Sequence, residues 1–289
     1  MNLIGIYQLF PSHNHCLEHL EKVRWRDKST CPYCQSLKVT PLPKEKRYHC
    51  NTCNTSFSVT VKTIFHHTHL PLQKWFLAIC LVLNAKKGVS ARQLGRDLKV
   101  TKDTAWRMAM KIRDAMRERE QRELLTGLVE MDETYIGGKP RKGSGQHKRG
   151  RGTEKVPVVG MVEREGTIKA EVVKKRKLDS KSLSSLVRRN VDIKNATLIT
   201  DEFKGYLGIK KFMLHQVVDH SVWYVSGDAH TNTIESFWAL LKRGIVGQYH
   251  KVTLRYLERY IDEFSYRWNH RKDENLFATT LLKSVGGIA

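Results

Sequence analysis

The chain has 289 residues, enough for two or three small domains and at least one sizeable hydrophobic core. Its 51 Lys and Arg residues outnumber 29 Asp and Glu residues, and the resulting formal charge of +22 favours binding to a polyanion and argues against an acidic, solvating tail. The alternatives for this charge are solubility alone, RNA binding or attraction to an anionic membrane surface. No apolar run approaches about eighteen residues and no basic segment opens the N-terminus, so we expect no membrane span, no secretory signal and a cytoplasmic location.

Four of the six cysteines form two C-x₂-C pairs with fifteen residues between them, a spacing typical of a zinc ribbon. Each pair forms a tight turn that directs two thiolates toward one metal ion, and the basic interval between the pairs suits a β-hairpin. Four unrelated reduced thiols would be the alternative. The sequence therefore predicts a structural Zn²⁺, without a catalytic role, in a domain of residues 1–65. Its predicted ligands are Cys31, Cys34, Cys50 and Cys53.

Residues 70–124 show the pattern of helices. A short amphipathic helix follows Ser90 and a longer one follows Thr101, and both residues are of the type that caps a helix N-terminus. Two helices joined by so short a turn predict a helix-turn-helix domain, whose second helix can enter the DNA major groove. An ordinary helical hairpin with a solvated basic face is the alternative. The residues expected to contact DNA from the second helix are Lys102, Arg107 and Lys111.

The stretch 139–152 is rich in glycine and basic residues. Such a composition predicts a flexible connection that becomes ordered on phosphates, or else a merely disordered loop. A loop without fixed geometry neutralises phosphates and does not read base edges. We therefore expect sequence-independent DNA contacts from Lys148, Arg149 and Arg151.

From residue 128 onward the pattern changes to short strands and a few helices. The predicted order is strand, strand, strand, helix, strand, helix, strand, helix, which is typical of a ribonuclease-H-like fold. The chain as a whole is thus predicted to be an α+β multidomain protein with a zinc ribbon, a helix-turn-helix and a ribonuclease-H-like α/β core in residues 127–289. The predicted strands are 128–136, 156–162, 168–173, 196–200 and 216–218, and the predicted helices with definite bounds are 180–189, 231–247 and 253–271.

Three acidic residues stand in three different local contexts within this core. Asp132 lies on the first predicted strand, Asp201 directly follows a second strand, and Glu235 lies on a following helix. Carboxylates from such elements can converge on a pair of Mg²⁺ ions, which prefer hard oxygen ligands and clamp the attacking and leaving oxygens of a phosphoryl displacement. The pattern therefore predicts nuclease or strand-transfer chemistry on DNA.

Neighbouring acids are weaker candidates for these positions. Glu133 and Glu202 each adjoin an expected ligand, but successive side chains of a strand point to opposite faces. Glu130 lies two residues before Asp132 and is predicted to share its face, so it remains an alternative ligand. Trp238, on the following helix, is interpreted as a core residue and not as a DNA contact.

Several longer stretches are similar to one family. They are MDETYIGGK at 131–139, TD at 200–201, HTNTIESFW at 230–238, KRG at 242–244, YH at 249–250 and FSYRWNHR at 264–271. On these motifs the chain resembles bacterial insertion-sequence transposases of the DDE superfamily, in the IS fifteen-ninety-five family, whose catalytic region is called ISXO-two-like. The resemblance covers nearly the whole chain, and the motifs together are far more specific than any single carboxylate.

The resemblance implies that Asp132, Asp201 and Glu235 hold two Mg²⁺ ions, with Mn²⁺ as an alternative metal. It also implies that Lys242, seven residues after Glu235 and therefore two turns along the same helix face, grips a DNA phosphate near the cut. A solvated surface lysine is the alternative. Asn232, about one helical turn before Glu235, is expected to orient that carboxylate or to touch the substrate.

By this resemblance, the protein binds the terminal inverted repeats of its own element, hydrolyses a phosphodiester there and uses the freed 3′-OH to attack target DNA. Its expected partners are both DNAs and a second copy of the chain in the synaptic complex, with no membrane, at the nucleoid of a bacterial cytoplasm. Two alternatives stay open: a catalytically silent, domesticated DNA-binding regulator, and a structure-specific nuclease on the same fold.

Overall fold

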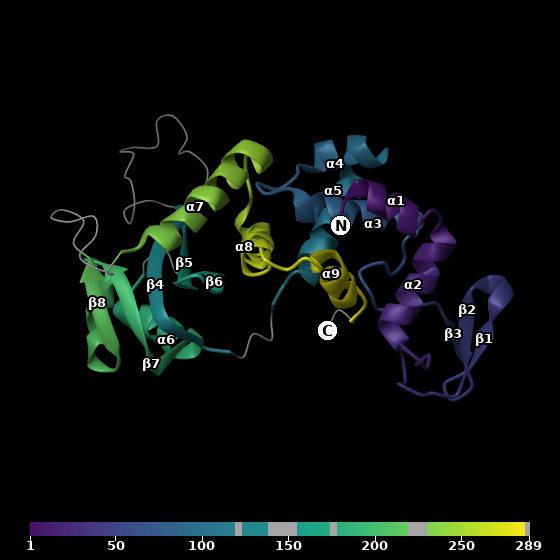
Figure 1. Cartoon of the computed structure of the whole chain (residues 1–289), viewed down its shortest axis with the longest axis horizontal. Helices are drawn as coiled ribbons and strands as arrows, with labels where there is room; N and C mark the ends of the chain where they lie inside the picture. The colour runs from purple at the N-terminus through teal and green to yellow at the C-terminus, as the bar shows by residue number, and fades with distance from the viewer. Residues whose placement is uncertain (119–122, 138–154, 174–177, 219–229, 287–289) are drawn as a thin grey trace. The chain divides into compact units, whose positions relative to one another are not determined.

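The computed structural model describes residues 1–118, 123–137, 155–173, 178–218 and 230–286 (Figure 1). The chain forms two compact units, one made of Met1–Arg117 with Lys272–Ala289 and the other of Glu118–Arg271. None of the described helices is both long and apolar enough to span a membrane.

The N-terminal unit opens with two helices and a small antiparallel sheet in the order β1-β2-β3. β1 and β2 form the predicted hairpin, and their register pairs Val39 with Cys50. One cysteine pair precedes β1 and the other lies at the end of β2, so the hairpin brings the two pairs together. The elements are α1 (Leu3–Leu9), α2 (His13–Trp25), β1 (Val39–Leu42), the 3₁₀ turn η1 (Pro43–Glu45), β2 (Arg47–Cys50) and β3 (Thr55–Phe57).

The predicted helix-turn-helix follows the ribbon. Its helices are α3 (Leu72–Asn84), α4 (Ala91–Leu98) and α5 (Lys102–Ala115). Ser90 Oγ and Thr101 Oγ1 each accept a hydrogen bond from a backbone N–H three residues on, at 3.2 and 3.3 Å, so both predicted caps are confirmed. The turn closes where Val100 N donates to Gly95 O at 2.9 Å. Glycine suits this place because a Cβ on Gly95 would lie 3.0 Å from the Val100 carbonyl oxygen.

The last helix of the chain, α9 (Leu276–Val285), belongs to the N-terminal unit. It contacts α2, α3 and α5, it buries Phe277 and Leu281, and Ile64 N donates to Ser284 O at 3.2 Å. The domain predicted for residues 127–289 therefore extends too far at its C-terminal end. The apolar face of a helix indicates that it packs, but it carries no local signal of which distant helices it packs on.

Replacing the fully buried Leu281 with Ala is expected to lower the free energy of unfolding of the N-terminal unit by about 2–5 kcal/mol, because it leaves a cavity. Leu282→Ala is the matched control, since the adjacent leucine is 51% exposed and its loss should cost no more than about 0.5 kcal/mol. Hydrogen exchange followed by mass spectrometry should show faster exchange of α2 and α3 in the Leu281 variant. Faster exchange confined to residues 118–271 would contradict the placement of α9.

The second unit is built on a mixed sheet, whose described strands lie in the order β6-β5-β4-β7-β8. β4 pairs antiparallel with β5, and β5 with β6, whereas β7 lies parallel to β4 and β8 parallel to β7. An antiparallel meander extended by parallel strands is the topology of the predicted ribonuclease-H-like core. The strands are β4 (Leu125–Ile136), β5 (Val156–Glu163), β6 (Ile168–Val172), β7 (Val191–Asp201) and β8 (Leu214–Val218).

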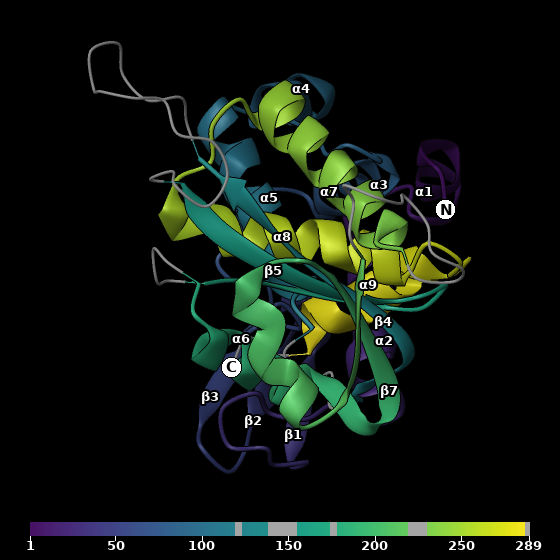
Figure 2. The same cartoon turned by 90° about the vertical axis from the view of Figure 1, so that its left-hand side faces the viewer.

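Helices cover both faces of this sheet (Figure 2). Side-chain alternation along β4 directs Val129 and Met131 to the core under α6 and η3, and Ile136 to the core under α7 and α8. The helix predicted between the last two strands is a 3₁₀ helix, η3. The helices are α6 (Ser180–Asn190), η3 (Lys204–Lys211), α7 (Asn232–Gly244) with its π-helical extension η4 (Ile245–Tyr249), and α8 (Leu254–Asn269).

Asn269 and His270, at the end of α8, attach this helix to the sheet. The Asn269 side chain accepts a hydrogen bond from Ile168 N at 2.8 Å and donates one to Ile168 O at 3.1 Å, so it continues the hydrogen bonding of β6. Asn269 Nδ2 also donates to Glu118 Oε2 at 3.0 Å, and His270 Nε2 lies 2.8 Å from Glu118 Oε1. The residues that open and close this unit are thus tied to each other and to the sheet.

Candidate active site

The parallel pairing of β4 with β7 sets Asp132 beside Asp201. The register ends with the pair Glu130 and Ile199, and Asp132 and Asp201 each lie two residues beyond this pair on their strands. Neighbouring strands lie about 4.8 Å apart, and residues in register point to the same face. Since Asp132 contacts α7 (below), both carboxylates belong to the sheet face that α7 covers.

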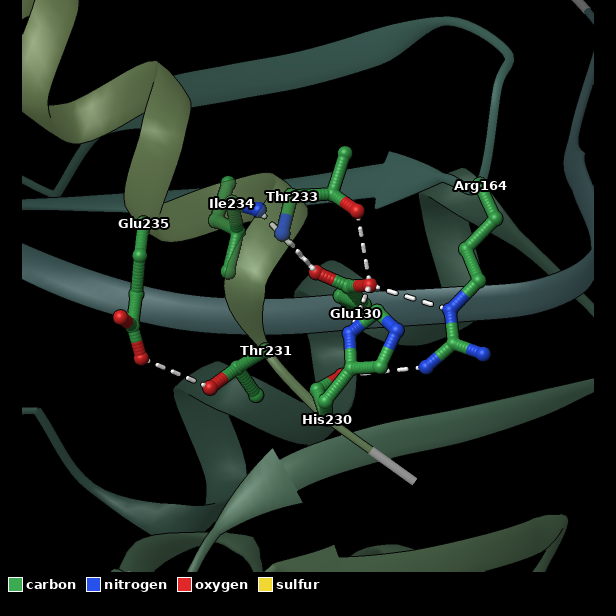
Figure 3. Close-up of polar contacts among 7 residues, drawn as sticks. All are labelled: Glu130, Arg164, His230, Thr231, Thr233, Ile234 and Glu235. Atoms are coloured by element: carbon green, nitrogen blue, oxygen red, sulfur yellow. Dashed lines mark hydrogen bonds and ion pairs between the residues drawn. The ribbon is translucent and has the colours of Figure 1, made fainter. Parts of the chain in front are cut away.

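Helix α7 brings a third carboxylate to this face. Glu235 lies in the first turn of α7, and its Oε1 accepts a hydrogen bond from Thr231 Oγ1 at 2.9 Å (Figure 3). Thr231, and not the predicted Asn232, therefore orients Glu235, whereas Asn232 is exposed at the start of the helix. A hydroxyl four residues before an acid at a helix start was the sequence signal that could have identified Thr231.

Asp132 is also oriented from α7. Trp238 Nε1 donates a hydrogen bond to Asp132 Oδ2 at 3.1 Å. The indole can approach this strand because the cross-strand partner of Asp132 is Gly160, where a Cβ would lie only 2.7 Å from the Trp238 ring. The prediction that Trp238 is a core residue is confirmed, since it is 3% exposed, but its polar contact with Asp132 was not predicted.

The other two acids of β4 have partners of their own. Glu133 faces the opposite side of the sheet, as predicted from alternation, and its Oε2 accepts a hydrogen bond from Tyr206 OH at 2.6 Å. Glu130 shares the face of Asp132, as predicted, but it is fully buried and both its oxygens accept hydrogen bonds from α7. Glu130 is therefore a partner of α7 in this structure, and not the alternative metal ligand that the sequence left open.

The carboxylates around Asp132 repel it from both sides of the sheet. Burial first, and then the negative charges of Glu133, Asp201 and Glu235, raise the pKa of Asp132 to about 7. A cation would relieve this repulsion, and carboxylate oxygens are the ligands that Mg²⁺ prefers. Within the described residues, Asp132, Asp201 and Glu235 do not form a cluster tight enough to hold a single metal ion.

Lys242 lies on the same side of α7 as Glu235. Both side chains are exposed, and two helical turns separate them, as predicted. The buried residues Ile234, Phe237 and Leu241 pack on the sheet, and Glu235 and Lys242 lie along one edge of this buried face. The exposed side of α7 thus carries an acid in its first turn and a base near its end.

The predicted DNA-binding residues of α5 differ in their surroundings. Lys102 and Arg107 are exposed. Lys111 is half-buried, its Nζ donates to His66 O at 3.0 Å and lies 5.9 Å from the centre of the Trp75 ring, and burial lowers its pKa. Because these contacts hold the ammonium inside the unit, the structure does not support a DNA contact by Lys111. The loop residues Lys148, Arg149 and Arg151 lie outside the described residues.

The four cysteines of the ribbon gather at one point. Cys31 Sγ lies 3.7 Å from Cys53 Sγ, Cys34 Sγ lies 3.5 Å from Cys50 Sγ, and all four sulfur atoms lie within 4.8 Å of one another. A tetrahedral Zn²⁺ with bonds of about 2.3 Å requires sulfur separations of about 3.8 Å. The backbone N–H of Cys53 lowers the pKa of the Cys50 thiol to about 6, which favours the thiolate that binds zinc. The residues therefore fit a closed, structural zinc site.

Comparison with known proteins identifies two domains. Residues 124–269 match the ISXO2-like transposase domain and residues 11–56 match the transposase zinc-ribbon domain. A Halobacterium salinarum protein, described as an uncharacterized protein in transposable element ISH50, is 30% identical over 251 residues, which cover 81% of this chain and 83% of that protein.

Two solved structures of the Mos1 transposase also resemble the chain. The paired-end complex with left transposon end is 14% identical, covers 72% of this chain and 78% of its own, and has a TM-score of 0.32. The mariner Mos1 paired end complex with Mg is 12% identical, with coverages of 96% and 91% and a TM-score of 0.30. These likenesses are too weak to assign a function.

Replacing Cys50 with Ser is expected to lower the zinc content from one ion per chain to nearly none and to unfold the ribbon, because thiolate ligation supplies most of the folding free energy of so small a module. Cys80→Ala removes a buried thiol outside the cluster and should keep the metal. Elemental analysis of the purified chains measures both. Zinc retained by the Cys50 variant, or far less than one zinc per wild-type chain, would contradict the site.

Proposed function

Because the chain belongs to the ISXO2-like transposase family, we propose that it binds the terminal inverted repeats of its own insertion sequence, hydrolyses a phosphodiester at each end and joins the freed 3′-OH to target DNA. Its proposed partners are these two DNAs and a second copy of the chain, since an element has two ends that must react together. The proposed location is the cytoplasm, at the nucleoid, where the substrate lies.

The observation that most directly supports this chemistry is the convergence of Asp132, Asp201 and Glu235. Two come from adjacent parallel strands and the third from the helix that covers the same sheet face. Burial first, and then neighbouring negative charges, raise the pKa of Asp132 to about 7. Divalent cations bound to these carboxylates would offset both effects.

We propose that Asp132, Asp201 and Glu235 would together hold two Mg²⁺ ions, with Mn²⁺ as a substitute metal. Bound ions supply the Lewis acidity that activates the attacking oxygen and stabilises the leaving oxygen. The part of the protein is to hold the carboxylates in place. Trp238 Nε1 does so for Asp132, and Thr231 Oγ1 does so for Glu235.

DNA is held, in this proposal, by basic residues outside the acidic group. Lys242 follows Glu235 on the exposed side of α7, so we propose that it grips a phosphate next to the bond that is cut. Arg107 and Lys102 are exposed on the second helix of the helix-turn-helix, where a side chain can reach base edges. Asn232, exposed at the start of α7, is proposed to touch the substrate.

Asp132→Asn, Asp201→Asn and Glu235→Gln are each expected to reduce cleavage and joining to background while end binding is retained. Each change removes a metal-ligand charge but keeps the size of the side chain. Gel-shift and cleavage assays on the same preparations, with Mg²⁺ or Mn²⁺, measure the two activities separately. Wild-type joining by any one of these variants would remove that residue from the site.

Glu202→Gln is the matched control, because this exposed acid adjoins Asp201 and should tolerate the change. A wild-type chain that binds ends but cleaves with neither metal would be the silent DNA-binding regulator. Cleavage without preference for the terminal repeats would instead indicate a structure-specific nuclease.

Arg107→Ala is expected to reduce discrimination between terminal-repeat and random DNA by about 1–3 kcal/mol, because a side chain on a rigid helix can read base edges. Neutralising Lys148, Arg149 and Arg151 together should weaken binding to both DNAs and flatten its salt dependence by about 0.9 in logarithmic slope per lost phosphate contact. Titrations of both DNAs at several salt concentrations test this. Loss of specificity in the loop variant, with loss of affinity alone in the Arg107 variant, would reverse the two roles.

A further inference from the structure

Glu130 is a fully buried carboxylate that the chemistry above does not use. It lies on β4 two residues before Asp132 and points into the N-terminal end of α7 (Figure 3). Its Oε2 accepts hydrogen bonds from Thr233 N at 2.8 Å and Ile234 N at 3.1 Å, and its Oε1 accepts one from Thr233 Oγ1 at 2.9 Å. One residue of the sheet is thus bonded three times to the first turn of the helix.

These bonds supply the cap that α7 does not make for itself. The first N–H groups of a helix have no partner within the helix, and the side chain of the N-cap residue usually accepts from them. Thr231 is the N-cap residue of α7, but its side chain makes no such bond, and its hydroxyl donates to Glu235 Oε1 instead. Glu130 therefore provides the acceptor from the sheet, and its negative charge is favourable at the positive end of the helix dipole.

Arg164 also holds the Glu130 carboxylate, and His230 lies beside it. Arg164 Nε donates to Oε1 at 3.1 Å, and Arg164 Nη2 donates to His230 O at 3.2 Å. His230 Nδ1 lies 3.3 Å from the same Oε1. Arg164 comes from the β5–β6 hairpin and His230 directly precedes α7, so the network joins the helix start to two strands (Figure 3). Because Arg164 bonds both the Glu130 carboxylate and the backbone that precedes α7, these contacts restrain the start of the helix.

The Glu130 network is one polar attachment of α7 to β4. Another is the hydrogen bond from Trp238 to Asp132. Thr233 and Trp238 lie on either side of Glu235 along the helix, so the position of Glu235 over β4 is set between the two attachments.

We propose that Glu130 is a positioning residue that sets the distance between the carboxylates of Asp132 and Glu235, and with it the affinity of this acidic group for divalent cations. The inference rests on the proposed function, because it takes these carboxylates as metal ligands. Replacement of a residue that holds a metal ligand in place typically weakens metal binding by about 10–100-fold.

The experiment measures Mn²⁺ binding to the zinc-loaded full-length chain by the electron paramagnetic resonance signal of free Mn²⁺. Glu130→Gln keeps the shape of the side chain but places an amide NH₂ where a carboxylate oxygen accepts, so its Mn²⁺ affinity should fall by about 10–100-fold. Thr233→Val leaves Glu130 and Arg164 in place and removes a single donor. It should fold normally and show a smaller loss in the same direction.

Cleavage at increasing Mn²⁺ gives a second readout. In Glu130→Gln the half-saturating Mn²⁺ concentration should rise, and the rate at saturating Mn²⁺ should return toward that of the wild type. Asp132→Asn is the reference, since it should lose both Mn²⁺ binding and cleavage.

Glu263 on α8 provides the matched control. It is also fully buried, pairs with Arg267 and accepts a hydrogen bond from Tyr249 OH at 3.1 Å. Glu263→Gln therefore disturbs a comparable buried ion pair in the same unit, and it should lower the melting temperature without changing Mn²⁺ affinity.

Weaker Mn²⁺ binding in the Glu130 and Thr233 variants, with wild-type affinity in the Glu263 variant, supports the inference. Unchanged affinity in both the Glu130 and Thr233 variants overturns it, as does an equal loss in the Glu263 variant. If Asp132→Asn leaves the Mn²⁺ affinity of the wild type unchanged, the proposed function itself fails and the inference fails with it, so the two failures are distinguishable.

Discussion

The attachment of α7 to β4 is the interaction on which the candidate active site depends. Asp132 and Asp201 lie on adjacent parallel strands, each two residues beyond the last paired residues, so the sheet sets their positions. Glu235 is on a helix, and no backbone ladder joins a helix to a sheet. Its position is set by side chains: the Glu130 carboxylate at the helix start and the Trp238 indole one turn beyond Glu235.

Three acids of β4 have different surroundings, and each has a different role as a result. Glu133 faces the α6 side of the sheet and accepts a hydrogen bond from Tyr206. Glu130 is fully buried, and its carboxylate accepts hydrogen bonds from α7 and from the Arg164 guanidinium. Asp132 is buried beside other acids and accepts a hydrogen bond from Trp238, and its pKa is raised. Of the three, Asp132 is the one whose surroundings favour binding of a cation.

The sequence by itself determined the features that depend on local pattern. Cysteine spacing is enough for the zinc site, because a closed site needs four ligands on two tight turns. Residues of the type at Ser90 and Thr101 cap helices wherever they occur, and both caps are present. The alternation of side chains along a strand predicted that Glu133 and Asp132 face opposite sides of the sheet. The predicted order of strands and helices, together with the family motifs, was enough to predict the ribonuclease-H-like core.

Only the tertiary structure decided which distant partners these residues meet. Lys111 has the residue type and spacing of a DNA contact, yet packing directs it to the His66 carbonyl. The apolar face of α9 joins the N-terminal unit, which neither its position in the chain nor its periodicity indicates. Glu130 reads as one more acid near the site, and its role follows from the N–H groups of a helix about one hundred residues later. Local patterns specify how a segment folds and which face it buries, whereas the partner of a buried polar group is set by the three-dimensional approach of other segments.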